Sequence, residues 1–532
     1  MQYIKGKDRN QCTLFPLCLD EIIDPDNDVR FIELFAESIS LPAFAFVTKQ
    51  SQEGRPAYHP KDLLKLFLYG YLNGIRSSRA LEKQCHINIE VRWLMRELAP
   101  DHNTIANFRR DNEKAIRKVF KHTVSIAKNF ELIGGKLIAG DSTKLRAQNS
   151  KKNNFNEKKI IQHIEYIDKK LDEYNAALAA ADDDPAVNKE AIQQQIEKQN
   201  KRRDGYQQLS KQIAESGEVQ VSTSDPDSRQ MIIRNNITEV AYNVQTTVDA
   251  QHALTLDYKV TNTNDSKALS GMLRRAKTIL QSNDFTALYD KGYHTGSELK
   301  YAVTSGVNIM VAVPGVAAFA PDEAYNFDHF FYNEQQDSYT CPQGNELKTN
   351  GNWYQKSKER SLYFVKHYKT SKCQDCPALA LCTKNKKGRL IERSEYQPFV
   401  DRNKQNIEAD PQTYKLRQQI IEHTYGIIKR QWGFYYVVTR RGMKRASADV
   451  GLMFTALNLR RIMNLVDKKL LQKFLQELWL SFSHGKVACK AIFGFTVLSV
   501  FFRSGLGLEN QLPFIGLYKA QIAYFYECNG SF

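Results

Sequence analysis

The sequence predicts an α/β protein whose sheet has strands of mixed direction. Two β-branched runs of alternating polarity, "EVAYNVQTTVDA" at 239–250 and "LTLDYKVTN" at 254–262, are joined by the short turn "QHA". Compact apolar runs at 137–139 and 307–313 are typical of buried strands. Amphipathic helical segments separate the later strands. The order strand, insertion, strand, strand, helix, strand, helix, strand indicates a mixed sheet.

Residues 1–130 read as a set of short helices. "PKDLLKLFLYGYLNG" repeats apolar residues at helical spacing, with Pro60 at the expected start and Gly74 at the expected stop. Ser78 and Asn103 are candidate caps of two further helices, the second of which carries Arg109 and Arg110. Short basic helices suit a DNA-binding unit of helix-turn-helix character. A helical scaffold domain fits the same pattern.

The stretch "GKLIAGDSTKLR", residues 135–146, carries the first candidate for chemistry. Gly140 is expected to let the backbone bend, so that Asp141 stands where a buried strand ends. A polar cluster follows at once: Ser142, Thr143, Lys144 and Arg146. A strand-end carboxylate among hydroxyls and cations suits a metal or phosphate site, although most such aspartates form turns or cap helices.

Residues 151–216 predict a helical hairpin inserted into the sheet domain. Apolar residues follow spacings of four and three, as in a coiled-coil seam: Ile160, Ile164, Ile167, Leu171, Tyr174 and Leu178. "DDDP" at 182–185 breaks this helix, and a returning helix with a poorer seam follows. Its charges nearly balance, which favours a solvated surface.

Residues 314–398 predict a second, cysteine-bearing insertion. Its four cysteines are Cys341 in "CPQG" and Cys373, Cys376 and Cys382 in "CQDCPALALC". A C-x₂-C pair with a distant cysteine before Pro-x-Gly resembles a structural zinc ribbon. Reduced thiols in a site that has lost its metal are the alternative. The remaining cysteines, Cys12, Cys18, Cys85, Cys489 and Cys528, show no ligand spacing.

Two further carboxylates join Asp141. "FTALYDKGYHTGSEL" predicts a strand ending at Asp290, followed by a glycine turn. "YKLRQQIIEHTYGIIKRQWGF" predicts a helix on which Glu422, Gly426 and Lys429 share one face. Glu422 and Lys429 could be a plain surface pair, but an interior glycine indicates that another group approaches closely. Three hard oxygen ligands suit two Mg²⁺ or Mn²⁺ ions and phosphoryl transfer.

The charge of the chain favours a polyanionic partner. Its 75 Lys+Arg and 59 Asp+Glu leave a formal net charge of +16. Residues 401–465 hold 12 Lys+Arg and 5 Asp+Glu, a net of +7. We expect no membrane span, since the longest apolar run, 488–502, is short and contains Lys490. Without a secretory signal the expected location is the cytoplasm, on the nucleoid when bound to DNA, with cysteines free or metal-bound.

These motifs together resemble the DDE transposases of bacterial insertion sequences, over roughly residues 50–465. "GDSTKLRAQNSK" and "YDKGYHTGSEL" are similar to the two aspartate motifs of that family, matching Asp141 and Asp290. "YKLRQQIIEHTYGIIKR" resembles its Tyr-Arg-Glu-Lys signature, here Tyr414, Arg417, Glu422 and Lys429. Four residues separate Arg417 from Glu422, where the family signature has three. The cysteine-bearing insertion resembles one branch of these enzymes.

The resemblance implies a ribonuclease-H-like catalytic domain at 131–465, a helical DNA-binding domain at 1–130 and a C-terminal extension of unknown role at 466–532. It implies that Asp141, Asp290 and Glu422 hold two Mg²⁺ or Mn²⁺ ions, with a homodimer forming the synaptic complex on DNA. Water would cut the element end, and the resulting 3′-hydroxyl would attack target DNA. The expected DNA contacts are Lys429, Arg430, Arg417, Tyr414, Trp432, Lys291 and His294.

Some residues near the motifs have two interpretations. Lys291 and His294 stand beside Asp290 and either contact the substrate or are ordinary loop residues. Asp265 in "TNDSKAL" is an acidic candidate, but a helix-cap role is favoured. Two other functions stay open for the whole chain. One is a metal-dependent DNA nuclease that never joins ends, and the other is a non-catalytic DNA-binding protein derived from a transposase.

Overall fold

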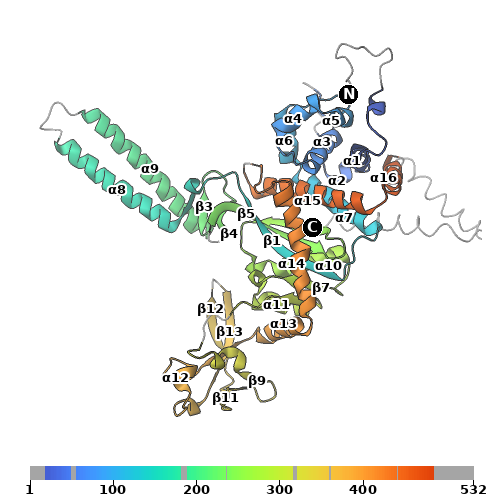
Figure 1. The fold of residues 1–532 in the computed structure, drawn as a ribbon. Helices are drawn as coiled ribbons and strands as arrows, with labels where there is room; N and C mark the ends of the chain where they lie inside the picture. The colour runs from blue at the N-terminus through green and yellow to red at the C-terminus, as the bar shows by residue number, and fades with distance from the viewer. Residues whose placement is uncertain are drawn as a thin grey trace, which may run out of the picture.

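The computed structural model describes residues 18–48, 56–180, 188–234, 237–315, 320–358, 361–439 and 441–483. Figure 1 shows a central sheet with helices above it, a long helical hairpin on one side and a small β-rich unit below. The predicted break at 182–185, the apolar run at 488–502 and the part of the C-terminal extension after residue 483 lie outside the described residues.

The central sheet has six strands of mixed direction, as the sequence predicts. The strands are β1 (Leu137–Arg146), β4 (Arg229–Arg234), β5 (Ile237–Asp249), β6 (Thr255–Thr261), β7 (Thr286–Tyr289) and β8 (Asn308–Val311). Five of them lie in the order β6–β5–β1–β7–β8, and β4 pairs with the start of β5. The β6–β5 and β5–β1 pairs are antiparallel, whereas β1–β7 and β7–β8 are parallel.

The two faces of the sheet are covered differently. Helices α7 (Glu113–Asn129), α10 (Leu269–Leu280), α11 (Gly296–Thr304) and α15 (Met443–Leu465) contribute to the large core on one face. On the other face α14 (Pro411–Gly426) packs Ile420 and Ile421 against Ala139 of β1. α13 (Gln397–Ala409) leads into α14 and contacts β8. The smaller cluster under α14 is the one nearest the predicted carboxylates.

The N-terminal helices share the large core with the sheet. They are α1 (Asp28–Glu37), α2 (Leu41–Phe44), α3 (Pro60–Leu72), α4 (Ser78–Ile87), α5 (Ile89–Leu94) and α6 (His102–Asp111), after the 3₁₀ turn η1 (Leu19–Ile22). Pro60 begins α3 as predicted. The two predicted caps are wrong: Ser77 precedes α4, and the Asp101 side chain accepts from Asn103 N and Thr104 N at the start of α6. In each case the capping residue lies N-terminal to the predicted one.

Helix α15 joins the N-terminal helices to the sheet. It contacts α3, α6 and α7 on one side and β6 on the other. Gly451 makes this close approach possible, because an added Cβ would lie 2.4 Å from Tyr258 Oη and 2.9 Å from Ile116 Cγ2. α16 (Lys468–Ser483) follows and packs on α1. The two ends of the described chain therefore meet over the same helical layer.

The segment after β1 forms two long helices, α8 (Glu157–Ala180) and α9 (Lys189–Ser216), which pack along each other and extend away from the sheet. A short ladder between β2 (Asn154–Asn156) and β3 (Gln220–Ser222) closes their base, beside the 3₁₀ turn η2 (Lys151–Asn153). Ile160 is buried there against Phe155 and Val221. These are the longest helices described, yet no helix in the described ranges is long and apolar enough to cross a membrane.

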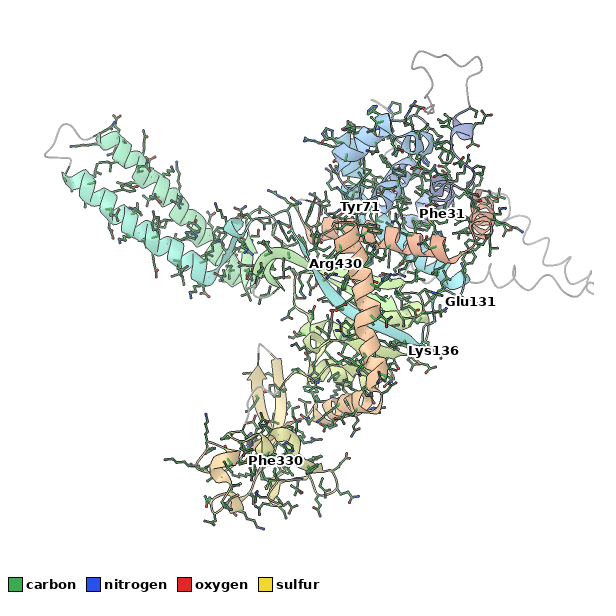
Figure 2. All side chains as sticks on the ribbon, viewed as in Figure 1. Phe31, Tyr71, Glu131, Lys136, Phe330 and Arg430 are labelled. Carbon is green, nitrogen blue, oxygen red and sulfur yellow. The ribbon has the colours of Figure 1, made fainter. Side chains whose placement is uncertain are left out.

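The segment between β8 and α13 folds into a separate antiparallel sheet. Its strands are β9 (Phe331–Asn333), β10 (Ser338–Thr340), β11 (Glu346–Thr349), β12 (Tyr354–Lys358), β13 (Ser361–Lys369) and β14 (Ile391–Ser394). Short helical turns complete it: η5 (Glu323–Tyr325), η6 (Phe327–His329), η7 (Ser371–Cys373) and α12 (Leu379–Cys382). Phe330, Tyr339, Leu347, Tyr368 and Ile391 form its small core. The position of Phe330 in this unit is visible in Figure 2.

One buried histidine makes the helical layer sensitive to acid. His122 of α7 is enclosed by the rings of Phe35 and Phe44, with centroid separations of 5.6 and 5.5 Å. Its Nε2 lies 3.4 Å from Ser38 Oγ. Burial lowers the pKa of His122 to about 4. The neutral imidazole is thus the form that fits the core.

Acidification from pH 7.5 to pH 5 is expected to destabilise this layer. Between about pH 6.5 and pH 4, His122 is protonated in the unfolded chain but neutral in the folded chain. The folded state therefore loses stability as the pH falls through this range. The loss from this residue is about 2 kcal/mol at pH 5. His122→Phe should flatten the fall in unfolding temperature, measured by calorimetry, whereas His86→Gln at an exposed site should not. An equally steep fall in His122→Phe would contradict the assignment.

Candidate active site

Asp141 lies within β1, and not at its end as predicted. The ladder between β1 and β5 runs without interruption from Ile138 to Arg146 and pairs Asp141 with Thr246. The parallel ladder to β7 is shorter and stops at the pair Ala139–Leu288. One edge of β1 is therefore open beside Asp141. A strand's end depends on its neighbours, which the local sequence of β1 does not reveal.

Asp290 comes to this open edge from the neighbouring strand. It follows β7 directly, as predicted, and its Oδ1 accepts from Gly292 N at 2.9 Å. Gly140 serves close packing here and not the predicted bend, because an added Cβ would lie 2.0 Å from the Tyr289 ring. Asp141 and Asp290 thus stand on adjacent parallel strands where those strands separate.

The environment of Asp141 disfavours its charge. Its pKa is raised to about 6, chiefly by burial and also by the neighbouring carboxylates of Asp290 and Asp265. The Ser142 backbone N–H, 2.7 Å from Oδ1, and the Arg417 guanidinium act in the opposite direction. A desolvated carboxylate among other carboxylates is a site that a bound cation would stabilise.

Asp265 belongs to this group and does not cap a helix, contrary to the sequence prediction. Its Oδ1 accepts from Asn243 Nδ2 at 2.7 Å and Gln245 Nε2 at 2.6 Å. Its Oδ2 lies 3.1 Å from Lys144 Nζ, which also donates to Ser142 Oγ at 2.8 Å. Although burial raises its pKa, Lys144 and these donors hold that pKa below its usual value. No local signal could reveal this group, because its members lie on three segments.

Arg417 reaches Asp141 from α14. Its Nη1 donates to Asp141 Oδ2 at 3.1 Å, and the two side chains are 19% and 23% exposed. One turn earlier, Tyr414 Oη donates to the backbone oxygen of Tyr289 at 3.1 Å. Both residues therefore anchor α14 to the strand ends that carry the aspartates. The additional residue between Arg417 and Glu422 does not prevent the arginine from facing the site.

Glu422 lies on the outer side of the same helix. Its Oε1 accepts from Gln418 Nε2 at 2.8 Å, and both residues are exposed. Gly426 has nothing within 4 Å of an added Cβ, so the predicted close approach is wrong. It precedes instead a π-helical turn, η8 (Ile427–Gln431). Such turns often occur at functional sites.

The π-helical turn positions the basic residues of the predicted signature. Lys429 is half-buried, and its Nζ donates to the backbone oxygen of Lys144 at 3.2 Å. Burial first, and then Lys144, lower the pKa of Lys429. Arg430 is exposed and lies in the same π-helical turn. Trp432 packs against Phe434, with its ring under the Arg460 guanidinium.

Lys291 and His294 flank Asp290 in the short turn η4 (Lys291–Tyr293) and just after it. Lys291 is exposed. His294 is half-buried, its Nε2 has no hydrogen-bond partner among the described residues, and burial lowers its pKa. Their role toward a substrate stays a prediction.

The donor set at this edge suits a hard divalent cation. Asp141 and Asp290 provide carboxylate oxygens on neighbouring strands, and a guanidinium already stands beside one of them. As the side chains lie, no three His, Cys, Asp or Glu residues of the described segments are grouped to hold a metal ion. The participation of Glu422 as a third ligand stays a prediction.

The four cysteines of the β-rich unit surround one small cavity, together with Leu347, Leu379 and Arg389. Cys341 lies in the turn between β10 and β11, while the others come from η7, the turn after it and α12. All four are free thiols. Burial raises the pKa of Cys382, Arg389 lowers it, and the other three thiols raise it further. Deprotonated sulfurs in this cavity would repel one another, and a bound cation would relieve that repulsion.

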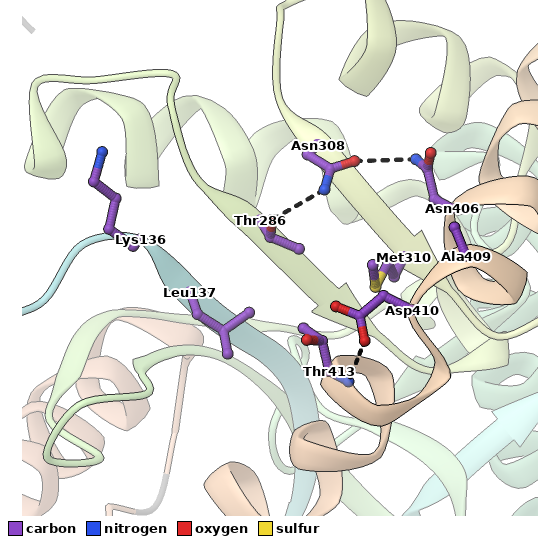
Figure 3. A pocket seen from close by; sticks show the side chains of 9 residues that line it. All are labelled: Lys136, Leu137, Thr286, Asn308, Met310, Asn406, Ala409, Asp410 and Thr413. Atoms are coloured by element: carbon purple, nitrogen blue, oxygen red, sulfur yellow. Dashed lines mark hydrogen bonds between the residues drawn. The ribbon is translucent and has the colours of Figure 1, made fainter.

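Another pocket lies away from the carboxylates. It is lined by Leu137, Thr286, Asn308 and residues of α13 and α14 (Figure 3). Leu137, Thr286 and Asn308 are the first residues of β1, β7 and β8. Asp290, in contrast, follows the end of β7. Asp410 at its rim caps α14 by accepting from Thr413 N at 3.0 Å. The pocket is therefore separate from the candidate active site.

Two segments of the chain match families described as transposase domains. Residues 17–111 match the family described as Transposase domain (DUF772), and residues 340–463 match the family described as Transposase DDE domain. The resemblance to insertion-sequence DDE transposases is thereby confirmed. The second match includes the four cysteines and Glu422, whereas neither match includes Asp141 or Asp290.

The search of curated proteins finds no match. Among solved structures, the chain is similar to a chain of the piggyBac transposase synaptic complex with hairpin DNA, determined by cryo-EM. The identity is 9%, the alignment covers 85% of this chain and 83% of that chain, and the TM-score is 0.22.

Proposed function

We propose that this protein is a DNA transposase that cuts the ends of an insertion sequence and joins them to target DNA. The observation that carries the proposal is the meeting of Asp141 and Asp290 at the open edge of β1, in a chain with two matched transposase segments. The net charge of +16 suits the polyanionic substrate.

The proposal includes a ribonuclease-H-like catalytic domain. The strand order β6–β5–β1–β7–β8, with antiparallel pairs followed by parallel ones, supports this assignment. The domain would span 131–465, with insertions at 151–216 and 314–398, after a DNA-binding domain at 1–130 and before an extension at 466–532. Because the N-terminal helices share a core with the sheet, the first domain would act as a fixed part of the enzyme.

In this proposal Asp141, Asp290 and Glu422 hold two Mg²⁺ or Mn²⁺ ions. Bound ions of this kind supply Lewis acidity for phosphodiester chemistry and lower the pKa of water. Asp141 and Asp290 are fixed by their strands, so the carboxylates start from a defined geometry. Glu422 would exchange its exposed hydrogen bond with Gln418 for this site. Asp265 and Lys144 would hold the neighbouring loop in place.

The same proposal assigns DNA contacts to residues around the open edge. Lys429 and Arg430 follow Glu422 along one helix and would neutralise phosphates near the cut. Lys291, His294 and Trp432 would contact the end DNA at the periphery. Arg417 and Tyr414 are bonded within the protein, so their DNA contacts would require rearrangement. A homodimer would bring two ends together.

We also propose that Cys341, Cys373, Cys376 and Cys382 hold a structural zinc ion. Their shared cavity and the raised pKa of Cys382 beside the other three sulfurs support this. Protein purified without chelators is expected to contain about one zinc per chain, as four-cysteine sites do. Cys376→Ser should release that zinc and make the β-rich unit more sensitive to protease, while Cys18→Ser should change neither. Zinc-free wild-type protein by elemental analysis would contradict the assignment.

Strand joining separates a transposase from the two other functions. The assay incubates the protein, Mg²⁺ and a supercoiled plasmid with a labelled duplex that carries a pre-cut end of the element. A transposase is expected to attach the label to the plasmid. A nuclease on the same fold would cut DNA without attaching label, and a non-catalytic DNA-binding protein would only retard the duplex. Either of those results would overturn the proposed function.

A further inference from the structure

Arg417 contacts Asp141, one of the two carboxylates at the open edge of β1. The side chain crosses from α14 to β1, and its Nη1 lies 3.1 Å from Asp141 Oδ2. Both groups are largely shielded from solvent. Such a charge-assisted bond is stronger than one on the surface, because water competes with it poorly.

The neighbouring charges leave Asp141 dependent on Arg417. Lys144 forms an ion pair with Asp265 instead, with its Nζ 3.1 Å from Asp265 Oδ2. Asp290 is bonded to the Gly292 N–H and disfavours a second negative charge close by. Within the described residues, Arg417 is the cation that forms an ion pair with Asp141. Removing that cation would leave a shielded carboxylate without a counter-charge, which is costly.

A guanidinium and a divalent ion beside the same carboxylate repel each other, so they compete for it. We infer that Arg417 is an internal counter-cation, which holds Asp141 in place in the metal-free protein and competes with a metal ion for this carboxylate. This inference rests on the proposed function, since it assumes that Asp141 is a metal ligand. It makes Arg417 a positioning residue that lowers the affinity for metal.

The inference predicts opposite effects on metal binding and on metal-free stability. Arg417→Gln removes the competitor, so Mn²⁺ should bind about three- to tenfold more tightly in the absence of DNA. The same variant should unfold at a lower temperature in EDTA, and saturating Mn²⁺ should close that gap. A residue with a merely structural role would lower the unfolding temperature equally with and without Mn²⁺.

The experiment titrates full-length protein with Mn²⁺ and measures free Mn²⁺ by electron paramagnetic resonance. Arg417→Lys keeps the charge without the planar fork, so its Mn²⁺ affinity should lie between those of wild type and Arg417→Gln. If circular dichroism shows that Arg417→Gln does not fold, Arg417→Lys provides the test in its place. Lys415→Gln removes an exposed cation from the same helix and should leave the affinity unchanged.

Asp141→Asn separates failure of this inference from failure of the proposed site. If Asp141→Asn abolishes Mn²⁺ binding while the Arg417 variants bind like wild type, the counter-cation role alone is overturned. If Asp141→Asn binds Mn²⁺ like wild type, the proposed metal site is wrong and the inference falls with it. An equal gain in Lys415→Gln would also overturn it, because the effect would then be a general change of charge.

Discussion

Asp141→Asn is expected to lose DNA cleavage by at least about a thousandfold while remaining folded. The substitution keeps the side-chain volume and the position in the β1–β5 ladder. It removes one hard ligand and one negative charge from the edge where Asp290 also lies. Burial and the neighbouring carboxylates disfavour the charge of Asp141, whereas the ion pair with Arg417 favours it, so the unfolding temperature in EDTA should change only slightly.

The measurement pairs Mg²⁺-dependent nicking of an end duplex with calorimetry of the same preparation. Asp284→Asn is a matched control, since Asp284 is an exposed aspartate in the loop before β7 that bonds Lys136 at 2.5 Å. It should nick like wild type. Wild-type nicking by Asp141→Asn would remove Asp141 from the site, and a large fall in unfolding temperature would indicate a structural role.

The largest effect on stability is expected at Asp449 of α15. This carboxylate is fully buried, accepts from Tyr71 Oη, and bonds the Val438 N–H at 2.8 Å. Two buried guanidiniums lie nearby, with Arg76 Nη1 at 3.6 Å and Arg109 Nη1 at 3.8 Å. Asp449→Ala leaves both guanidiniums without this carboxylate and should destabilise the protein by about 3–5 kcal/mol.

Urea denaturation of Asp449→Ala, Asp449→Asn and Tyr71→Phe tests this network. Asp449→Asn keeps an acceptor but not the charge, so it should be intermediate. Tyr71→Phe removes one hydroxyl and should cost about 1 kcal/mol. The segment after the π-helical turn depends on the network too, because Arg76 Nη1 donates to the Tyr436 backbone oxygen at 2.8 Å. A loss below about 1 kcal/mol in Asp449→Ala would contradict this account.

Local patterns predicted the elements that local physics determines. Pro60 predicts the start of α3, and alternating polarity predicts β5 and β6. The apolar run before Asp290 predicts β7. The helix carrying Glu422 was predicted from its periodicity. In each case the deciding signal lies within about one element of sequence.

Features that depend on distant partners could not be predicted in this way. Asp141 lies within β1 because β5 continues beside it, more than a hundred residues along the chain. The Arg417–Asp141 bond joins positions 276 residues apart. The turn sequence around Asp265 favours a helix cap. In the folded chain, however, two amides of β5 and Lys144 of β1 donate hydrogen bonds to its carboxylate. The sharing of one core by the N-terminal helices and the sheet is likewise visible only in the folded chain.

Mg²⁺-dependent nicking of a labelled element-end duplex by Glu422→Gln tests most directly whether Asp141, Asp290 and Glu422 form one metal site. Glu422 is exposed, so its replacement by glutamine should leave the fold and DNA binding intact. Nicking is expected to fall by several orders of magnitude, because the metal site loses a ligand. Glu408→Gln and Asp410→Asn, at exposed carboxylates before α14, should nick like wild type. Near-wild-type nicking by Glu422→Gln, with loss in either of the other two variants, would show that the third carboxylate lies elsewhere.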